Sequence, residues 1–231
     1  VSKYSLSAIM GSANTGKSNL VNRFNKLNLR DIYMIYKDHN EYSMYTYDPK
    51  DMGAMEYRYN EVARKCGITV PDFKLMDGKY FATKRFDIEN GIRYHIATAG
   101  ALLNESIMQP RLDYKTLLHL VGYLTQDPKQ VDEMFRRMVF NVLTDNKDDH
   151  AKNFSFIYKE GNWALSPAYD LTRCNNGYNG EHATSVNNHG NPTIEDMLIV
   201  GESIRIPRKK GKEMILTIAE GCAELLSKKG I

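Results

Sequence analysis

The residues whose types and spacing could do chemistry lie in the run 146–153 and at Asp170. Asp148 is followed five positions later by Asn153, and Asp170 comes after a short segment that favours a hairpin. A carboxylate can accept a proton from a hydroxyl group, and an amide oxygen and a second carboxylate can hold magnesium on nucleotide phosphates. The pattern therefore predicts phosphoryl transfer, with Asp148 as the catalytic residue and with Asn153 and Asp170 as the metal ligands.

An earlier loop has the composition of a phosphate-binding loop. Residues 11–18 read Gly-Ser-Ala-Asn-Thr-Gly-Lys-Ser, and the apolar run at residues 4–10 before them favours a strand. Backbone amides in such a loop surround phosphates, and Lys17 would contact them. Because the spelling also matches the Walker A pattern, a P-loop NTPase is the alternative prediction. Against that alternative, the rest of the chain lacks the alternation of strands and helices that builds a parallel sheet.

The first part of the chain is expected to be rich in strands. Its expected strands and single helix lie at residues 31–37, 51–66, 72–76 and 79–86, of which 51–66 is the helix. The helix is expected to stop at Gly67. Asp77 and Gly78 between the last two strands favour a hairpin turn.

The second part is expected to be mostly helical. The expected helices are at residues 113–124, 128–144, 193–199 and 209–228, with strands at 154–158 and 163–165 and an Asn- and Gly-rich loop at 172–192. The sequence thus predicts an α+β fold of two lobes, a β-rich nucleotide-binding lobe over residues 1–85 and a helical catalytic lobe over residues 86–231. A nucleotide would lie between the lobes.

Composition excludes several classes of protein. Three widely separated cysteines without a Cys-x-x-Cys pair argue against a disulfide scaffold or a zinc site and favour a cytoplasmic protein. No apolar run approaches the ~20 residues that span a bilayer, so we expect no membrane partner. The net charge of +3 does not indicate a dedicated nucleic-acid binder, and the basic run at 205–212 is expected to be a solvated loop and helix start.

The chain resembles the HipA family, the serine/threonine kinase toxins of bacterial toxin–antitoxin systems. The similar segments are 140–143, 146–156 and 165–170, with weaker similarity at 56–71 and 84–87. The resemblance implies a two-lobed protein-kinase-like fold, ATP and Mg²⁺ as cofactors, and Asp148, Asn153 and Asp170 in the roles given above. It further implies a protein substrate such as an aminoacyl-tRNA synthetase, an antitoxin partner, and DNA contact only through that antitoxin.

The nucleotide-binding residues then expected are Gly11, Ser12, Ala13, Asn14, Thr15, Gly16, Lys17, Lys37, Lys84, Arg85, Phe86, His150, Lys152, Asn153, Tyr169 and Asp170. Within this set, residues 84–86 would meet adenine through their backbone, and His150 and Tyr169 would line the nucleotide. Lys37 is the expected phosphate-binding lysine. Either Glu56 or Glu61 would pair with it. Lys152 would balance phosphate charge or face solvent.

The phosphate loop departs from the family pattern at the position of autophosphorylation. Family members phosphorylate a loop serine three residues before the first glycine, and this offset falls on Ala8. Ser7 and Ser12 are the neighbouring candidate autophosphorylation sites, with Ser5 as a third. Besides the P-loop NTPase, a catalytically silent kinase-like binding module stays an alternative. The retention of Asp148, Asn153 and Asp170 together argues against it, because a degenerate kinase usually loses at least one metal ligand.

Overall fold

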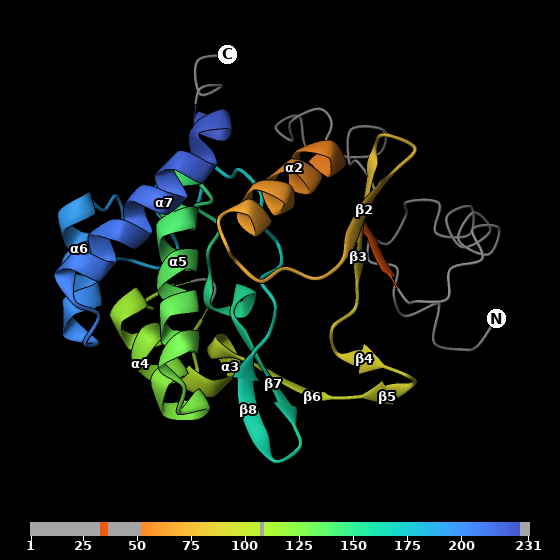
Figure 1. Cartoon of the computed structure of the whole chain (residues 1–231), viewed down its shortest axis with the longest axis horizontal. Coiled ribbons are helices and arrows are strands. Elements are labelled where there is room, and N and C mark those ends of the chain that lie inside the picture. The colour runs from red at the N-terminus through yellow and green to blue at the C-terminus, as the bar shows by residue number, and fades with distance from the viewer. Residues whose placement is uncertain (1–32, 37–51, 107–108, 227–231) are drawn as a thin grey trace. The chain divides into compact units, whose positions relative to one another are not determined.

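The computed structural model describes residues 33–36, 52–106 and 109–226 (Figure 1). The described residues form an α+β protein that divides into two compact units. The first unit includes residues up to Asn60 and Pro71–Arg93, and the second includes Glu61–Val70 and residues from Tyr94 onward. The chain therefore passes between the units after Asn60, after Val70 and after Arg93. The lobe boundary expected at residue 85 stays a prediction.

The first unit contains an antiparallel sheet of three strands, β1 (Tyr33–Tyr36), β2 (Phe73–Met76) and β3 (Tyr80–Lys84), in the order β1-β3-β2. The hairpin expected between β2 and β3 is confirmed. Asp77 and Gly78 both have positive φ, and the backbone N–H of Lys79 donates to the carbonyl of Met76 over 3.0 Å. These values fit a type I′ turn, whose twist matches that of the flanking strands. Two short strands, β4 (Ile88–Glu89) and β5 (Ile92–Arg93), follow as a second hairpin.

Helix α2 (Met52–Lys65) confirms the helix expected at 51–66, and the expected stop, Gly67, lies two residues after its last residue. Gly67 has a φ of +73°, and the N–H of Ile68 donates to the carbonyl of Ala63 over 3.0 Å. This left-handed residue satisfies carbonyls at the helix end without a Cβ penalty. Near the other end, a Cβ on Gly53 would lie 2.0 Å from the carbonyl oxygen of Lys79, so only glycine permits the helix to approach the β2–β3 hairpin so closely.

The second unit is built mainly from helices. They are α3 (Ala99–Leu103), α4 (Tyr114–Thr125), α5 (Pro128–Thr144), α6 (Ile194–Ser203) and α7 (Arg208–Leu226). Asp113 and Asp127 cap the starts of α4 and α5, because each carboxylate accepts a hydrogen bond from the backbone N–H two residues later. Thr193 and Asp196 form a capping box at the start of α6. These polar residues explain why the helices begin close to the expected positions.

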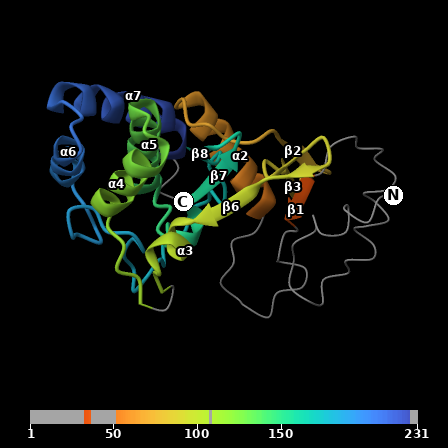
Figure 2. The same ribbon diagram turned by 90° about the horizontal axis from the view of Figure 1, so that it is seen from below.

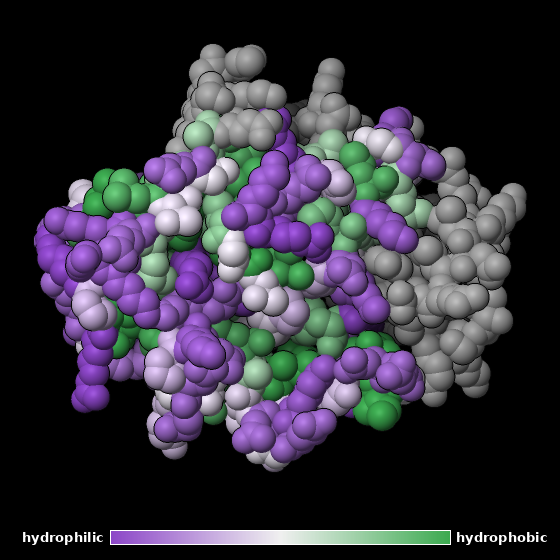
Figure 3. Space-filling view, in the orientation of Figure 1, coloured by the Kyte–Doolittle hydropathy of each residue, from purple (hydrophilic) through white to green (hydrophobic). Residues whose placement is uncertain are grey.

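The core of the second unit lies where α5 packs against α4 and α7. Fully buried apolar side chains from these helices include Leu117, Leu118, Val121, Met134, Phe135, Met138, Phe140 and Ile218. Figure 2 shows the helices of this unit gathered beside the sheet that contains β7 and β8. On the face seen in Figure 3, hydrophilic side chains cover most of the surface over α6 and α7, and hydrophobic residues there are scattered. Scattered exposed apolar residues are usual and do not indicate a docking surface.

The second unit also holds an antiparallel sheet of β6 (His95–Thr98), β7 (Ser155–Lys159) and β8 (Asn162–Leu165), in that order. The β7–β8 hairpin is close to the strands expected at 154–158 and 163–165. The strand β6 and the short helix α3 were not predicted. Because β6 pairs with β7, in the register His95 to Tyr158, its partner lies far away in sequence and leaves no local signal.

Candidate active site

The 146–153 loop begins where helix α5 ends. Asp145 has a φ of +56°, and the backbone N–H of Asn146 donates to the carbonyl of Asn141 over 3.0 Å. After the loop's extended part, residues Ala151–Asn153 form one 3-10 turn, and β7 follows directly. The loop is therefore fixed at one end by the long buried helix and at the other by the central strand of the sheet.

Asp148 presents its carboxylate to solvent while its backbone is held. Its side chain is 55% exposed, and its carbonyl oxygen accepts a hydrogen bond from Asn153 Nδ2 over 2.8 Å. His150 Nε2 lies 3.9 Å from Asp148 Oδ1. Partial burial raises the pKa of Asp148 above its ordinary value; Asp170 and Asp149 act in the same direction, and His150 opposes them. A carboxylate with a raised pKa is a stronger base than an ordinary aspartate.

Asp170 and Asn153 lie together beside Asp148. The Asn153 side chain interacts with the Asp170 carboxylate, and the charges of Asp170 and Asp148 interact. Burial raises the pKa of Asp170, while His150 and the hydrogen bond from Asn153 lower it. Asp170 has a φ of +58°, a left-handed conformation that aspartate and asparagine adopt more readily than other non-glycine residues. The second unit thus brings together the three residues that the sequence predicted for catalysis and metal binding.

The three other site residues predicted in this region have different surroundings. His150 is half-buried, and within the described residues its Nδ1 atom is buried without a hydrogen-bond partner. The hydroxyl of Tyr169 donates to the carbonyl of Lys152 over 2.7 Å and is also hydrogen-bonded to Ser155. Tyr169 directly precedes Asp170, and its side chain therefore fixes this part of the chain to the 3-10 turn and to β7. Lys152 is exposed. Nucleotide contact by these three residues stays a prediction.

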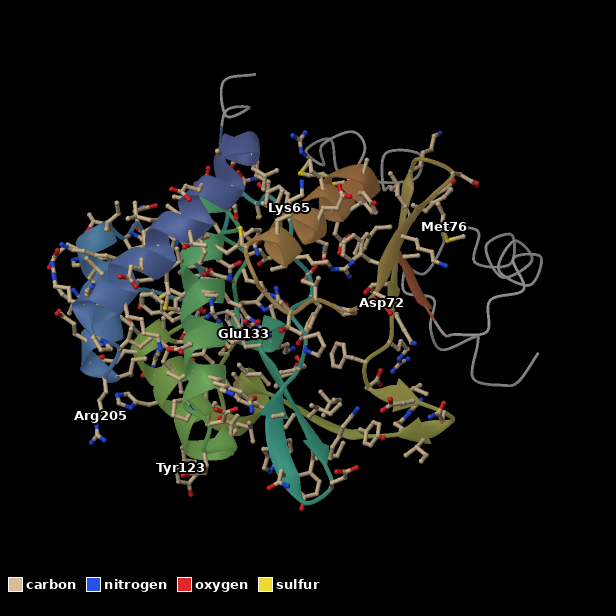
Figure 4. All side chains as sticks on the ribbon, in the orientation of Figure 1. Lys65, Asp72, Met76, Tyr123, Glu133 and Arg205 are labelled. Atoms are coloured by element: carbon tan, nitrogen blue, oxygen red, sulfur yellow. The ribbon has the colours of Figure 1, made fainter. Side chains whose placement is uncertain are left out.

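A buried ion pair on α5 holds the segment that leads to Asp170. Arg137, 4% exposed, donates from Nε and Nη2 to Glu133 Oε1, and its Nη2 also donates to the carbonyl of Ser166 over 2.9 Å. Glu133, labelled in Figure 4, also accepts the backbone N–H of Thr69 over 2.9 Å. The N–H of Ala168 donates to the carbonyl of Thr69 over 2.8 Å. One carboxylate–guanidinium pair therefore anchors both chain segments.

Sequence reasoning missed the importance of Asp149. Its side chain is fully buried, whereas that of the adjacent Asp148 is half exposed. Its carboxylate accepts hydrogen bonds from Tyr114, His182 and Thr184. Two consecutive carboxylates before a histidine offered one usable signal. Neighbouring side chains of extended backbone point in opposite directions, so the two could not share one environment.

The remaining predicted site residues lie elsewhere. Lys84 ends β3 in the first unit, and Arg85 and Phe86 follow it there. Arg85 donates to Asp87, with 2.7 Å between Nε and Oδ1, which raises the pKa of Arg85. Glu56 is buried in the first unit, on α2, and Glu61 lies further along the same helix in the second. The loop Gly11–Lys17, the candidate autophosphorylation sites Ser7 and Ser12, and Lys37 lie outside the described residues.

Two kinds of feature are absent from the described residues. Over 52–106, 109–226 and β1, no group of three or more His, Cys, Asp and Glu side chains could hold a metal ion. The predicted set of Asn153 and Asp170 is not of that kind, since one of its two ligands is an amide. In the same part of the chain no helix has the length and apolar character to cross a membrane.

Comparison with known proteins finds a curated relative and several solved structures of similar fold. The Sinorhizobium fredii protein named "Putative kinase Y4dM" is 30% identical over 150 residues, which cover 57% of this chain and 36% of that protein. The HipA chain from Shewanella oneidensis, solved with HipB and operator DNA, aligns with a TM-score of 0.68 at 17% identity, over 85% of this chain and 51% of that one. This chain therefore spans only part of both proteins.

The Helicobacter pylori proinflammatory kinase CtkA aligns with a TM-score of 0.51 at 14% identity, over 85% of this chain and 88% of that chain. At these identities both structures show the fold alone, and they confirm a fold of the kind found in HipA and CtkA. The sequence itself matches the HipA-like C-terminal domain family over residues 15–226, nearly its whole length. The expected resemblance is therefore confirmed, and the chain belongs to the HipA-like C-terminal domain family.

Proposed function

We propose that this chain is a serine/threonine protein kinase that transfers the γ-phosphate of ATP to a protein hydroxyl. The observation that carries the proposal is the arrangement of one half-exposed carboxylate, Asp148, beside a partly buried carboxylate, Asp170, and an amide, Asn153. Family membership and the kinase name of the Sinorhizobium relative support it. In this proposal Asp148 orients the acceptor hydroxyl and accepts its proton.

The side chains of Asn153 and Asp170 fit a magnesium ion. Mg²⁺ prefers oxygen ligands and usually combines one or two carboxylates with phosphate oxygens and water. Asn153 Nδ2 donates to the carbonyl of Asp148, so its Oδ1 is the atom available to a cation. Magnesium, when bound with ATP, would neutralise the charge that develops on the transferred phosphoryl group. Burial is the main cause of the raised pKa of Asp148, and the charge of Asp170 adds to it; a bound cation would offset this repulsion.

The alternative of a P-loop NTPase receives no support from the described part of the chain. Every pair of named strands there is antiparallel. P-loop enzymes are built on a mostly parallel sheet covered by helices. We therefore interpret the Walker A spelling at residues 11–18 as a phosphate loop of the kinase.

For the whole protein we propose the role of a toxin in a toxin–antitoxin system. The Shewanella HipA was solved in complex with HipB and operator DNA, and that assembly is the basis for proposing an antitoxin partner and indirect contact with DNA. The protein substrate proposed from the family resemblance is an aminoacyl-tRNA synthetase. The third alternative, a silent binding module, is disfavoured because Asp148, Asn153 and Asp170 are all present and close together.

Phosphoryl transfer is tested by intact mass spectrometry after incubation with Mg-ATP, alone and with casein as a general acceptor. We expect the wild type to add phosphoryl groups to itself or to casein, and Asp148→Asn to bind ATP but add none. Asp145→Asn is the matched control, because Asp145 lies three residues earlier and asparagine tolerates its left-handed conformation. Steady ATP hydrolysis without any phosphoprotein, equal in wild type and Asp148→Asn, would refute the kinase and favour the NTPase.

A further inference from the structure

The buried carboxylate of Asp149 lies beside the proposed catalytic residue and takes no direct part in the proposed chemistry. Its side chain is 0% exposed. An ionised carboxylate out of contact with water is costly unless donors surround it. Asp149 Oδ2 accepts from the hydroxyl of Tyr114 over 2.9 Å and lies 3.0 Å from His182 Nδ1, and its Oδ1 accepts the N–H of Thr184 over 3.2 Å. Three donors from two distant parts of the chain therefore meet at this carboxylate.

The backbone around Asp148 is held by the same part of the chain. The carbonyl of Lys147 accepts the N–H of Ala183 over 3.1 Å, and the carbonyl of Asp149 accepts the hydroxyl of Thr184. The carbonyl between them, that of Asp148, is the one bonded to Asn153 Nδ2. Consecutive peptide groups at the proposed catalytic residue are thus fixed, and the Asp148 carboxylate alone is left pointing toward solvent.

Residues 182–184 belong to the 172–192 segment, which begins just after Asp170. Further back in this segment, Cys174 exchanges two backbone hydrogen bonds with the loop, from Lys147 N–H to its carbonyl over 3.1 Å and from its own N–H to the carbonyl of Asp145 over 3.0 Å. The side-chain amine of Lys147 donates to the carbonyl of Gly180 over 2.7 Å. The 172–192 segment therefore follows the 146–153 loop and contacts it at several points.

A relay of hydrogen bonds reaches Asp149 from the helical side. Asn146 Nδ2 donates to Asn141 Oδ1 over 3.0 Å, Asn141 Nδ2 donates to the Tyr114 hydroxyl over 2.9 Å, and that hydroxyl donates to Asp149. Burial raises the pKa of Tyr114 well above its ordinary value, and the Asp149 charge adds to this effect, so the phenol keeps its proton and remains a donor. Hydrogen bonds aligned in this way strengthen one another in a buried site.

We infer that His182 is a positioning residue, which acts through Asp149 to hold the 146–153 loop, and with it Asp148, in the orientation needed for phosphoryl transfer. Its contribution to transfer rests on the proposed kinase function, while its hold on the loop does not. Of the three donors to the Asp149 carboxylate, Tyr114 is on α4 and Thr184 acts through its backbone. His182 is therefore the side chain through which the 172–192 segment controls this carboxylate. The imidazole is 3% exposed and lies 3.0 Å from Asp149 Oδ2, so Nδ1 carries the proton in this hydrogen bond.

The chemistry of the donor suggests variants that separate positioning from packing. Asparagine attaches its amide nitrogen to Cγ, as histidine does Nδ1, so His182→Asn keeps a donor at the required distance from the backbone. His182→Gln moves the donor one bond further along, and His182→Leu fills similar space without any donor. If only packing matters, leucine should be at least as good a replacement as asparagine. If the donor matters, asparagine should be the better one.

The control is a second histidine–aspartate pair in the same stretch of chain. His189 Nδ1 lies 2.9 Å from Asp196 Oδ1, but the histidine side chain is 62% exposed and the contact is to helix α6. His189→Leu removes a contact of the same type without touching the 146–153 loop. We expect this variant to keep the wild-type rate of phosphoryl transfer and the wild-type protection of the loop.

Two measurements on the full chain test the inference, namely kcat and KM for ATP in phosphoryl transfer, and amide hydrogen exchange of peptides covering residues 145–153. We expect His182→Leu to lower kcat by roughly 10- to 100-fold, the usual effect of misplacing an active-site group through its supporting residue. KM for ATP should change less than kcat. Exchange in the loop should become faster, because the hydrogen bonds that protect it open more often. His182→Asn should restore both quantities toward wild type.

Unchanged kcat and loop exchange in His182→Leu would overturn the inference, and so would equal defects in His182→Asn and His182→Leu. If the wild type transfers no phosphate, the proposed kinase function fails, and hydrogen exchange alone decides whether His182 holds the loop. Should His182→Leu fail to fold, two comparisons replace it. In the first, loop exchange in His182→Asn is compared with that in His182→Gln. In the second, loop exchange in Thr184→Val, which lacks the hydroxyl donor to the Asp149 carbonyl, is compared with that in the wild type. If loop exchange is equal within each comparison, the positioning role is refuted.

Discussion

The carbonyl oxygen of Asp148 accepts a hydrogen bond from the side-chain amide of Asn153, with 2.8 Å between O and Nδ2. Because the Asn153 side chain also lowers the pKa of Asp170, Asn153 links the two carboxylates of the site. It fixes the backbone of one and partly compensates the charge of the other. Asparagine is suited to both tasks, since it offers donors to the protein and keeps one oxygen for a cation.

Replacing Asn153 by alanine should therefore impair two properties at once. We expect kcat for phosphoryl transfer to fall by about 10²–10³, the usual effect of removing one polar group that stabilises developing charge. The Mg²⁺ concentration for half-maximal activity should rise, because one oxygen ligand is lost. Titration of activity against Mg²⁺ measures both. Asn162→Ala, at an exposed asparagine of the β8 hairpin, is the control, and a wild-type Mg²⁺ titration for Asn153→Ala would contradict the assignment.

Arg137 should contribute far more to stability than its neighbour Arg136. Both arginines pair with Glu133. The side chain of Arg137 is 5% exposed and its Nη2 lies 3.0 Å from Glu133 Oε1, whereas the side chain of Arg136 is 33% exposed and its Nη1 lies 3.7 Å from Glu133 Oε2. Arg137→Ala should cost about 3–5 kcal/mol, because Glu133 and the Ser166 carbonyl lose a buried partner. Arg136→Ala should cost less than about 1 kcal/mol. Urea denaturation of both variants measures the difference, and equal losses would show that the buried pair has no special role.

Asp196 should stabilise the start of α6 in a manner that depends on pH. Hydrogen bonds from Asn187 and Thr193 hold the pKa of Asp196 well below its ordinary value. The unfolded chain therefore binds this proton more readily than the folded one. The stabilisation is complete above the ordinary pKa of ~3.9 and is lost as pH falls through the lowered pKa.

We expect Asp196→Ala to lower the free energy of unfolding by about 2 kcal/mol at pH 7. The difference from wild type should shrink as pH is lowered below ~4. Urea denaturation at pH 7, 5 and 3.5 measures it. Glu195→Ala, at the exposed neighbouring residue, should cost less than about 1 kcal/mol. A difference between Asp196→Ala and wild type that stays constant down to pH 3.5 and below would exclude the lowered pKa as its cause.

Two helical glycines should respond oppositely to alanine. A Cβ on Gly122, in α4, would lie 3.5 Å from Val131 Cγ2, an ordinary contact, so the higher helix propensity should raise stability by about 0.5–1 kcal/mol. A Cβ on Gly221, in α7, would lie 2.5 Å from Cys66 Sγ. We expect Gly221→Ala to lower stability by about 1–3 kcal/mol despite the same gain in propensity.

Thermal unfolding of both glycine variants tests this contrast. The double variant Gly221→Ala with Cys66→Ala should recover part of the loss, because the obstructing sulfur is removed and the two changes interact. Additive losses in the double variant would mean that the steric contact with Cys66 is not the cause.

Helices α4, α5 and α6 and the β7–β8 hairpin were predictable because their signals are local. Asp113, Asp127 and Thr193 precede apolar runs and become the caps of α4, α5 and α6. Glu160 and Gly161 have positive φ at the β7–β8 turn, where the sequence indicated one. The helix expected at 193–199 extends to Ser203, and its buried residues Val200 and Gly201 continue the packed face beyond residue 199.

The grouping of Asp148, Asn153 and Asp170 was also predictable. The first two residues share one loop, and the short β7–β8 hairpin brings the chain back from that loop to Asp170. The surroundings of Asp149 were not, since its partners Tyr114 and His182 are more than thirty residues away on either side. Strand β6 was missed for the same reason. Pairing partners that are distant in sequence are specified by the assembled fold, and no window of neighbouring residues contains them.

The repeated passage of the chain between its two units limits how the protein can be divided. Residues Glu61–Val70 belong to the second unit, where Cys66 meets Cys222 with 3.8 Å between the sulfurs and Thr69 bonds to Glu133. A fragment beginning at Tyr94 would therefore lack a piece of its own interior and leave Cys222 of α7 without its contact to Cys66. Only a fragment that starts before Glu61 retains all that the second unit needs, and it necessarily brings residues 71–93 with it.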